Sequence, residues 1–198
     1  MAGPMVDARK VAGTYLFVGA AQFVVGMMIA EAVYPGYSIS GNFISDLGVG
    51  PAAPVFNASV VLLGVFVLAA AYFLRKSFFP RTAWGTIVAA FFLLAGAGAV
   101  GVGIFTEDAG AMHTVVSLVT FLFGALAAIA TFTFVGPPLR YFSLFLGVAS
   151  LVALVLFGAG AYAGLGKGGM ERMIAYPILL WAMGFGGYLM KAPPLRRE

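Results

Sequence analysis

The residues from Ile87 to Phe105 read IVAAFFLLAGAGAVGVGIF, a run of nineteen without one charged or hydrogen-bonding side chain. A helix of about 20 apolar residues crosses the roughly 30 Å hydrocarbon core of a bilayer. The run therefore predicts a transmembrane helix. Its second half consists mostly of Gly and Ala, which predicts close packing against neighbouring helices, because lipid tails provide no hydrophobic drive for association.

Five further apolar stretches of similar length accompany this one along the 198-residue chain. Only the connector over 34–54 is long, so consecutive helices are expected to pack antiparallel. We predict an all-α fold, a six-helix transmembrane bundle that forms a single domain over residues 1–198. The predicted spans cover about 11–33, 55–74, 82–105, 113–135, 141–165 and 173–190.

The composition excludes most soluble classes of protein. Hydrophobic residues make up 62% of the chain and charged residues 9%, whereas a soluble domain carries about 25% charged residues. Soluble enzymes, nucleic-acid binders and disordered proteins are therefore excluded, and membrane lipids are the expected partners. The chain has no cysteine, so disulfides and thiolate metal sites are ruled out. No metal site and no cofactor is predicted.

Lysine and arginine predict the orientation of the bundle. Cytoplasmic loops carry an excess of these residues, so both termini are expected in the cytoplasm of a multi-pass protein of the cell membrane. Two basic residues, Lys167 and Arg172, lie at the opposite, outer end together with five of the seven acidic residues, which is where we expect function to lie. The inner basic residues are Arg9, Lys10, Arg75, Lys76, Arg81, Arg140, Lys191, Arg196 and Arg197, and the outer acidic residues are Glu31, Asp46, Glu107, Asp108 and Glu171.

The first outer connector contains a predicted short helix, Asn42–Gly48. Asn42 is suited to the N-cap and Gly48 to the position after the last turn. Its large apolar residues share one face that can pack on the bundle, although a surface loop with one amphipathic turn remains an alternative. The polar candidates of this region are Asn42, Ser45, Asp46 and, at the outer end of the second span, Asn57.

Three acidic residues lie near the ends of the first and third spans. Glu31 follows twenty uncharged residues of the first span, so its carboxylate is expected either to reach the headgroups or to face a polar cavity. Glu107 and Asp108 follow the third span and are expected beside the outer mouth of the bundle.

The single histidine opens the fourth span. His113, Ser117 and Thr120 follow i, i+4, i+7 spacing and therefore share one face of a helix. Such a polar face indicates either a proton or ligand site or hydrogen bonds to a neighbouring helix, and the sequence leaves both open.

The sixth span begins near Glu171, Arg172 and Tyr176, with Arg172 and Tyr176 one turn apart. An unpaired charge at this depth costs several kcal/mol, so we predict that Arg172 pairs with Glu31, Asp46 or Glu107 and lies near His113. The network is interpreted either as a structural latch or as part of a ligand site.

Two further small-residue pairs are candidates for helix packing: Gly160 with Gly164 on the fifth span, and Gly124 with Ala128 on the fourth. Such pairs bring helices together within one chain or between copies. Packing within the chain is the simpler interpretation because six helices must be packed, and a homo-oligomer stays open.

Several of these motifs together resemble a known family. Ile44-Ser-Asp-Leu-Gly48, Phe56-Asn57, His113 with Ser117, Gly168-Gly-Met-Glu-Arg172 and Tyr176-Pro177 are similar to the archaeal and bacterial membrane family named domain of unknown function 998. The resemblance extends over nearly the whole chain. The layout is also similar, more distantly, to that of DRAM-like six-span proteins. The resemblance implies a six-span architecture and no particular reaction.

Three classes of function remain. We expect a polar, acidic extracytosolic pocket that binds a lipid headgroup or a small polar ligand. The alternatives are a membrane-embedded lipid-modifying enzyme with an Asp/Glu/His site on the outer face, and a transporter of ions or small molecules. The inner half of the bundle holds almost no polar residue besides Gln22, so a path through the membrane is poorly marked.

Overall fold

Six long helices build the protein. The computed structural model describes residues 7–191, and within this range the helices are α1 (Ala8–Val33), α2 (Ala53–Ser77), α3 (Ala83–Ile104), α4 (Ala111–Thr131), α5 (Leu139–Gly158) and α6 (Gly166–Lys191). Three short 3-10 turns lie in the connectors: η1 (Ser45–Gly48), η2 (Gly50–Ala52) and η3 (Glu107–Ala109). The described residues form no strand, which confirms the predicted all-α class.

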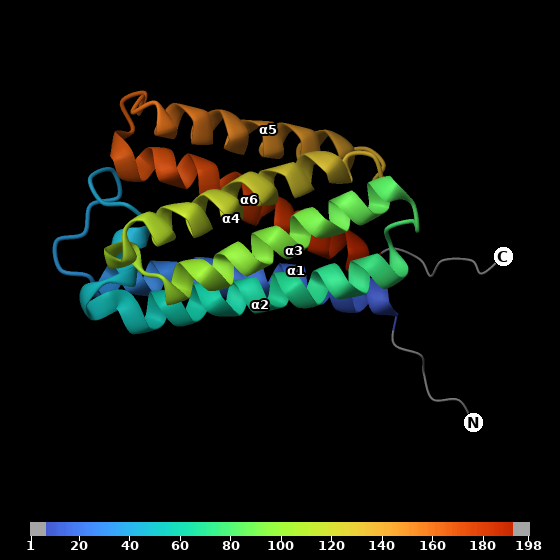
Figure 1. The fold of residues 1–198 in the computed structure, drawn as a ribbon, viewed down its shortest axis with the longest axis horizontal. Helices are drawn as coiled ribbons and strands as arrows, with labels where there is room; N and C mark the ends of the chain where they lie inside the picture. The colour runs from blue at the N-terminus through green and yellow to red at the C-terminus, as the bar shows by residue number, and fades with distance from the viewer. Residues whose placement is uncertain (1–6, 192–198) are drawn as a thin grey trace.

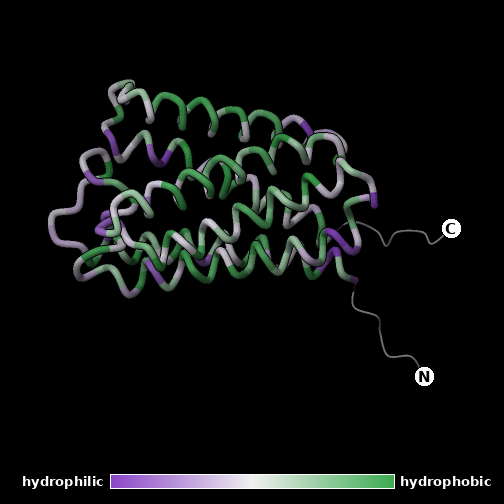
Figure 2. The backbone as a smooth tube through the Cα atoms, viewed as in Figure 1, coloured by the Kyte–Doolittle hydropathy of each residue, from purple (hydrophilic) through white to green (hydrophobic). Residues whose placement is uncertain are grey.

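The lateral surface of the bundle is suited to lipid. All six helices are long and apolar enough to cross a membrane. Large apolar side chains point outward from them, such as Phe145 and Val155, which are 68% and 71% exposed. Apolar residues fill the middle of the bundle and polar residues gather at its two ends (Figure 2). The protein is therefore a multi-pass membrane protein.

The helices run side by side and alternate in direction (Figure 1). Each packs on the next along the chain, and α1 packs on α6, so the helices form a closed ring. α4 also contacts α6 across the inside of this ring. As a consequence α5 lies outside these two helices, and α1, α2, α3, α4 and α6 surround the interior.

Glycines of α3 bring it close to two neighbours. A methyl group built on Gly96 would lie 3.0 Å from the carbonyl oxygen of Gly64 on α2. One built on Gly98 would lie 2.6 Å from Oγ1 of Thr120 on α4. The Gly/Ala-rich stretch therefore serves packing within the chain, with α2 on one side of α3 and α4 on the other.

The two other small-residue pairs differ from each other. Gly124 faces Ile178 of α6, with 3.2 Å between a built Cβ and Cγ2, so it also packs within the chain. Gly160 and Gly164 do not lie on a helix, because α5 ends at Gly158. Their φ angles of +70° and +78° belong to turns, where glycine is favoured. The prediction that the fifth span reaches residue 165 and carries a glycine packing face is wrong.

The sixth helix begins at Gly166, earlier than the predicted residue 173. Hydropathy placed the polar run before Arg172 in a loop, whereas the structure has it in the first two turns of α6. Those turns are held by contacts with the first connector, which a hydropathy pattern does not show.

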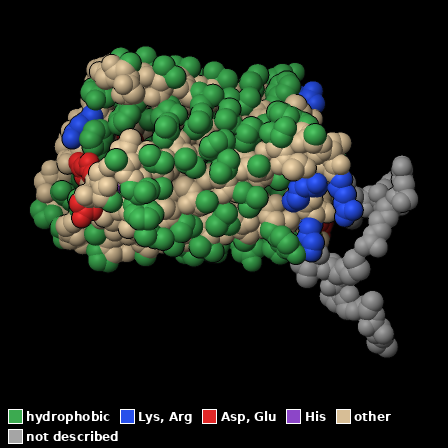
Figure 3. Space-filling model, in the orientation of Figure 1, with side chains coloured by type: hydrophobic (Ala, Val, Ile, Leu, Met, Phe, Trp, Pro, Cys, Tyr) green, Lys and Arg blue, Asp and Glu red, His purple; other side chains and the backbone are tan. Residues whose placement is uncertain are grey.

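The two ends of the bundle differ in charge. Acidic side chains lie at the end that holds the first connector, and most Lys and Arg side chains lie at the other end (Figure 3). Assigning the basic end to the cytoplasm rests on the positive-inside rule and stays a prediction. Arg196 and Arg197 lie outside the described residues.

Candidate functional site

The first connector, residues 34–52, lies across the acidic end of the bundle and is tied to the start of α6. The amide of Gly168 donates a hydrogen bond to the carbonyl oxygen of Ser40 at 3.0 Å. The backbones are in such close contact here that a methyl group on Gly168 would lie 1.8 Å from the carbonyl oxygen of Asn42. Only glycine fits at this point of α6, so the connector is docked on the helix.

Arg172 clamps three segments together. Its Nη2 donates to Oε1 of Glu31 on α1 at 2.5 Å and to the hydroxyl of Tyr37 at 2.7 Å. Its Nη1 donates to the carbonyl oxygens of Ile39 and Gly168 at 3.1 and 3.0 Å. The residue is 4% exposed, and its Nε is buried without a partner. With both terminal nitrogens engaged, the guanidinium joins α1, the connector and α6.

Tyr37 extends this clamp into the connector. Its hydroxyl donates to the carbonyl oxygen of Phe43 at 2.9 Å. Burial raises the pKa of Tyr37 to about 12, against the opposing effect of its hydrogen bond with Arg172. Tyr37 therefore keeps its proton at neutral pH and remains a donor.

Glu171 holds the connector one residue before the clamp. Its Oε2 accepts the amide hydrogen of Ile44 at 2.5 Å, and the residue is only 7% exposed. The main chain at Ile44 is thereby fixed over the interior of the bundle.

The predicted helix Asn42–Gly48 is instead the 3-10 turn η1. The side-chain oxygen of Asn42 accepts from the amide of Ser38, so it closes the preceding turn rather than capping a helix. Oδ2 of Asp46 accepts from the amide of Phe43 at 3.0 Å and from Nδ2 of Asn42 at 2.7 Å. The seven-residue helix is wrong because these side chains compete for the backbone donors. The prediction that the segment packs on the bundle is correct, since Leu47 is fully buried.

Glu107 of η3 meets Asp46 of η1. Partial burial, then the hydrogen bond and the charge of Asp46, raise the pKa of Glu107 to about 7, and the charge of Lys167 opposes the shift. Lys167 itself lies over the ring of Phe43, 4.1 Å from its centroid. Two carboxyl groups in contact favour a shared proton, so this pair joins the first and third connectors most firmly when it is protonated.

Several of the predicted site residues form no hydrogen bond with Arg172. Asp108 is exposed and bonds to Thr106 of its own turn. Asn57 donates to the carbonyl oxygen of Gly48 at 2.9 Å, and its Oδ1 is buried without a partner. Tyr176 lines a shallow groove between α1 and α6. His113 bonds to the carbonyl oxygen of Phe105, at the end of α3, and to Ser117.

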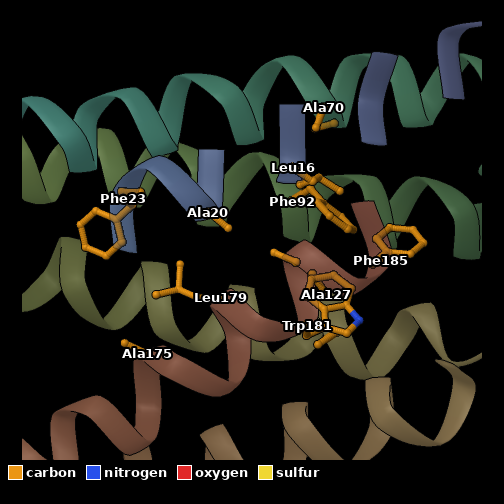
Figure 4. Close-up of a cluster of buried hydrophobic side chains, with 14 of the residues drawn as sticks. Leu16, Ala20, Phe23, Ala70, Phe92, Ala127, Ala175, Leu179, Trp181 and Phe185 are labelled. Atoms are coloured by element: carbon orange, nitrogen blue, oxygen red, sulfur yellow. The ribbon is translucent and has the colours of Figure 1, made fainter. Parts of the chain in front are cut away.

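The interior of the bundle encloses a cavity of about 110 Å³ with almost entirely apolar walls. Side chains from five helices point into this region, and several of them are shown in Figure 4. Its polar lining is limited to Ser45, Ser117, Thr120 and Glu171, of which Thr120 lies in the middle of α4 and the other three lie nearer the acidic end. The cavity is thus apolar, with its few polar groups in the half that is nearer the acidic end.

Aromatic rings close the other end of the cavity. Trp181 lies 5.8 Å from Phe92 and 5.4 Å from Phe185, measured between ring centroids. Phe78 packs on Phe185 at 5.7 Å and continues the cluster towards the basic end of the bundle. The cavity therefore ends in a packed aromatic layer.

These elements fall within one family match. The model of the family described as "Protein of unknown function (DUF998)" matches residues 17–187. The chain belongs to this family. The match includes the Arg172 clamp, the connector and all lining residues of the cavity except Leu16. Nothing among the curated proteins or the solved structures matches the chain, and the similarity to DRAM-like proteins stays a prediction.

Several residues at the site of this DUF998 protein were not predicted from the sequence. Tyr37 was not singled out, although it bonds to Arg172, and neither were the cavity walls, which come from five separate helices. A buried Tyr in a connector gives no signal in hydropathy, and apolar walls have the same composition as the lipid-facing surface. Within residues 7–191 no group of three or more His, Asp or Glu side chains is arranged to hold a metal ion.

Proposed function

We propose that the protein binds one amphipathic lipid at its acidic end, with a single apolar chain inside the cavity and the polar end of the molecule at the mouth beneath the first connector. The observation that carries this proposal is the distribution of polarity along the cavity. Its walls are apolar over most of their length, and the four polar residues lie in the half that is nearer the acidic end. A site with apolar walls and a few convergent polar groups is the usual form of a ligand pocket.

The volume of the cavity and the charge of its lining residues limit the kinds of lipid that can bind. A volume of about 110 Å³ is on the scale of apolar cavities that take up a benzene-sized molecule, so it accommodates a short part of one narrow chain and not two chains. The polar lining offers hydroxyl groups and a carboxyl group, and it includes no Lys or Arg. A phosphate group would be poorly matched here. An uncharged polar end, such as the ester and hydroxyls of a monoacylglycerol, suits the site better.

The closed inner end supports binding over transport. A transported solute needs a route past the layer formed by Phe92, Trp181 and Phe185, whose rings pack on one another. The polar lining also extends no further than Thr120, in the middle of α4, so apolar side chains dominate the inner half of the cavity.

Two substitutions on α3 test the proposal. Ala99 is 2% exposed and lines the cavity, whereas Ala97 is exposed on the same helix. Ala99→Leu places three carbon atoms in the cavity, and Ala97→Leu adds the same atoms on the lipid side. Native mass spectrometry of each purified protein with added monooleoylglycerol measures binding.

The wild-type protein and Ala97→Leu are expected to retain one monoacylglycerol per chain, and Ala99→Leu at least tenfold less. Equal retention by both variants would contradict binding inside the cavity. Retention of diacyl phospholipid in preference to the monoacyl lipid would contradict the proposed ligand class.

A further inference from the structure

Ser117 and His113 form a hydrogen-bonded pair beside the cavity. They lie one turn apart on α4, with 3.2 Å between Oγ of Ser117 and Nε2 of His113. Nδ1 of His113 lies 2.7 Å from the carbonyl oxygen of Phe105, at the end of α3. A carbonyl oxygen only accepts hydrogen bonds, so Nδ1 carries the proton in the neutral imidazole. Nε2 is then an acceptor, and the hydroxyl of Ser117 donates to it.

This direction distinguishes Ser117 from other hydroxyl groups on the helices. Thr14, Ser77, Thr120 and Thr131 each donate to the carbonyl oxygen of the residue four positions earlier. That bond is the usual way for a helical hydroxyl group to satisfy itself. Ser117 donates to an imidazole instead, which is the arrangement that activates a serine as a nucleophile.

The placement of the pair matches the proposed ligand. Ser117 lines the cavity and His113 does not, and His113 is 9% exposed. Ser117 therefore borders the cavity, while the base is held behind it. Ser117 lies six residues from the first residue of α4, which is about 9 Å along the helix axis. It is at the end of the cavity where Glu171 and Ser45 meet, so it lies beside the polar end of the ligand.

We propose that Ser117 is a nucleophile and His113 its general base, and that together they cleave the ester of a single-chain lipid bound in the cavity. This inference rests on the proposed function and adds a reaction to it. The carbonyl of Phe105 has the role of the third group in a catalytic triad, because it fixes the tautomer and the orientation of the imidazole.

The reaction needs water and no other co-reactant. Oγ of Ser117 adds to the ester carbonyl carbon, and its proton moves to Nε2 of His113. The bond between the carbonyl carbon and the alcohol oxygen then breaks, and the alcohol leaves with that proton. Water entering at the mouth attacks the acyl-serine, His113 takes one of its protons, and the proton is returned to Oγ as the fatty acid is released. No atom is oxidised or reduced.

Ser45 offers a donor for the negative charge that develops on the carbonyl oxygen. Its side chain lines the same end of the cavity, and within residues 7–191 its hydroxyl group forms no hydrogen bond. A donor that meets the oxyanion is commonly the largest single contribution to such a reaction. Ser45 has no histidine beside it, so it serves as an internal control for the nucleophile.

A fluorophosphonate with a short alkyl chain tests the pair directly, because it reacts with activated serines and a short chain is within the volume of the cavity. The full-length protein in detergent is incubated with the reagent, and intact mass and peptide mapping report the modified residue. We expect one adduct per chain at Ser117, none at Ser45, and none on Ser117→Ala.

His113→Asn separates catalysis from structure. The Asn amide keeps an N–H group near the position of Nδ1 and can still donate to the carbonyl of Phe105, but it offers no base to Ser117. Loss of a general base slows a reaction by roughly 10²- to 10⁴-fold. We therefore expect labelling at least 100-fold slower with a melting temperature close to that of the wild-type protein. Labelling of His113→Asn at the wild-type rate would overturn the proposal.

Binding of monooleoylglycerol to Ser117→Ala distinguishes this proposal from the function on which it rests. If the variant and the wild-type protein both retain the lipid and the wild-type protein is not labelled at Ser117, the nucleophile is wrong and the binding site stands. If neither retains the lipid, the proposed function fails, and labelling of the wild-type protein at Ser117 alone would still support the activated serine.

Discussion

The guanidinium group of Arg172 on α6 lies 2.5 Å from the carboxylate of Glu31 on α1, although 140 residues separate them in the chain. The side chains are 5% and 19% exposed, so both charges are largely removed from solvent. The pair lies where the ring of helices closes between α1 and α6, and the same guanidinium holds the connector through Tyr37. Closure of the bundle and docking of the connector therefore depend on one side chain.

Replacing Arg172 by Met is expected to destabilise the protein strongly. The change leaves the carboxylate of Glu31 without its partner, and removing one member of a buried ion pair costs about 3–5 kcal/mol. Thermal unfolding in detergent measures the effect. The double variant Arg172→Met/Glu31→Leu is expected to recover part of the loss, because no unpaired charge remains. A single variant as stable as the wild-type protein would show that the pair does not hold the helices.

Replacing Gly168 by Ala is expected to release the connector from α6. The added methyl group would lie 1.8 Å from a backbone oxygen, which cannot rotate away, and overpacking of this kind costs about 1–3 kcal/mol. Hydrogen exchange of the amides over 38–47 should become faster while the middle of the helices stays protected. Gly184→Ala is the matched control, because nothing lies within 4 Å of its built Cβ. Equal exchange in the two variants would contradict docking through Gly168.

The six-helix architecture could be predicted from the sequence because the lipid bilayer permits few backbone conformations. An apolar stretch such as 87–105 has few alternatives to a transmembrane helix, since every backbone polar group in the bilayer must be satisfied within the chain. The ion pair of Arg172 could also be predicted from the sequence, because few charged residues lie at the same depth in the membrane and can serve as its partner. Sequence reasoning named three carboxylates for it, and the structure selects Glu31.

Other features depended on contacts that no pattern reports. The start of α6 and the 3-10 turn around Asp46 depend on particular hydrogen bonds. Some of these bonds join residues that are far apart in the chain, such as Glu171 and Ile44, which are 127 positions apart. The cavity could not be predicted from the sequence either, because it is the space left between side chains of five packed helices. The sequence placed His113 and Ser117 on one helix face, and the structure adds the hydrogen bond between them and the contact of His113 with the carbonyl oxygen of Phe105.

Cysteine labelling tests the orientation of the bundle. The chain has no native cysteine, so Ser40→Cys in the first connector and Ala83→Cys at the start of α3 each provide a single, exposed position. The excess of Lys and Arg at the end that holds Ala83 predicts a cytoplasmic location. In intact cells an impermeant maleimide should react at position 40 and should react at position 83 only after lysis. The reverse pattern would invert the topology.

The contact of Glu107 with Asp46 predicts that stability falls as pH rises. The pKa of Glu107 is raised in the folded protein from 4.5 to about 7, mainly by burial and then by Asp46. Between these values the folded state binds more protons than the unfolded state, so the free energy of unfolding decreases with increasing pH. The stabilisation is complete below about pH 4.5 and is lost as pH passes 7.

Glu107→Gln isolates this effect, because the amide retains a hydrogen-bond donor for Asp46 and does not ionise. Melting temperatures of the wild-type protein in detergent should decline from pH 5 to pH 8, and those of Glu107→Gln should decline less. At pH 8 the variant is expected to be the more stable of the two, since it avoids two adjacent negative charges. If the two proteins show the same dependence on pH, or if the wild-type protein gains stability over this range, the carboxyl pair does not control the contact between the first and third connectors.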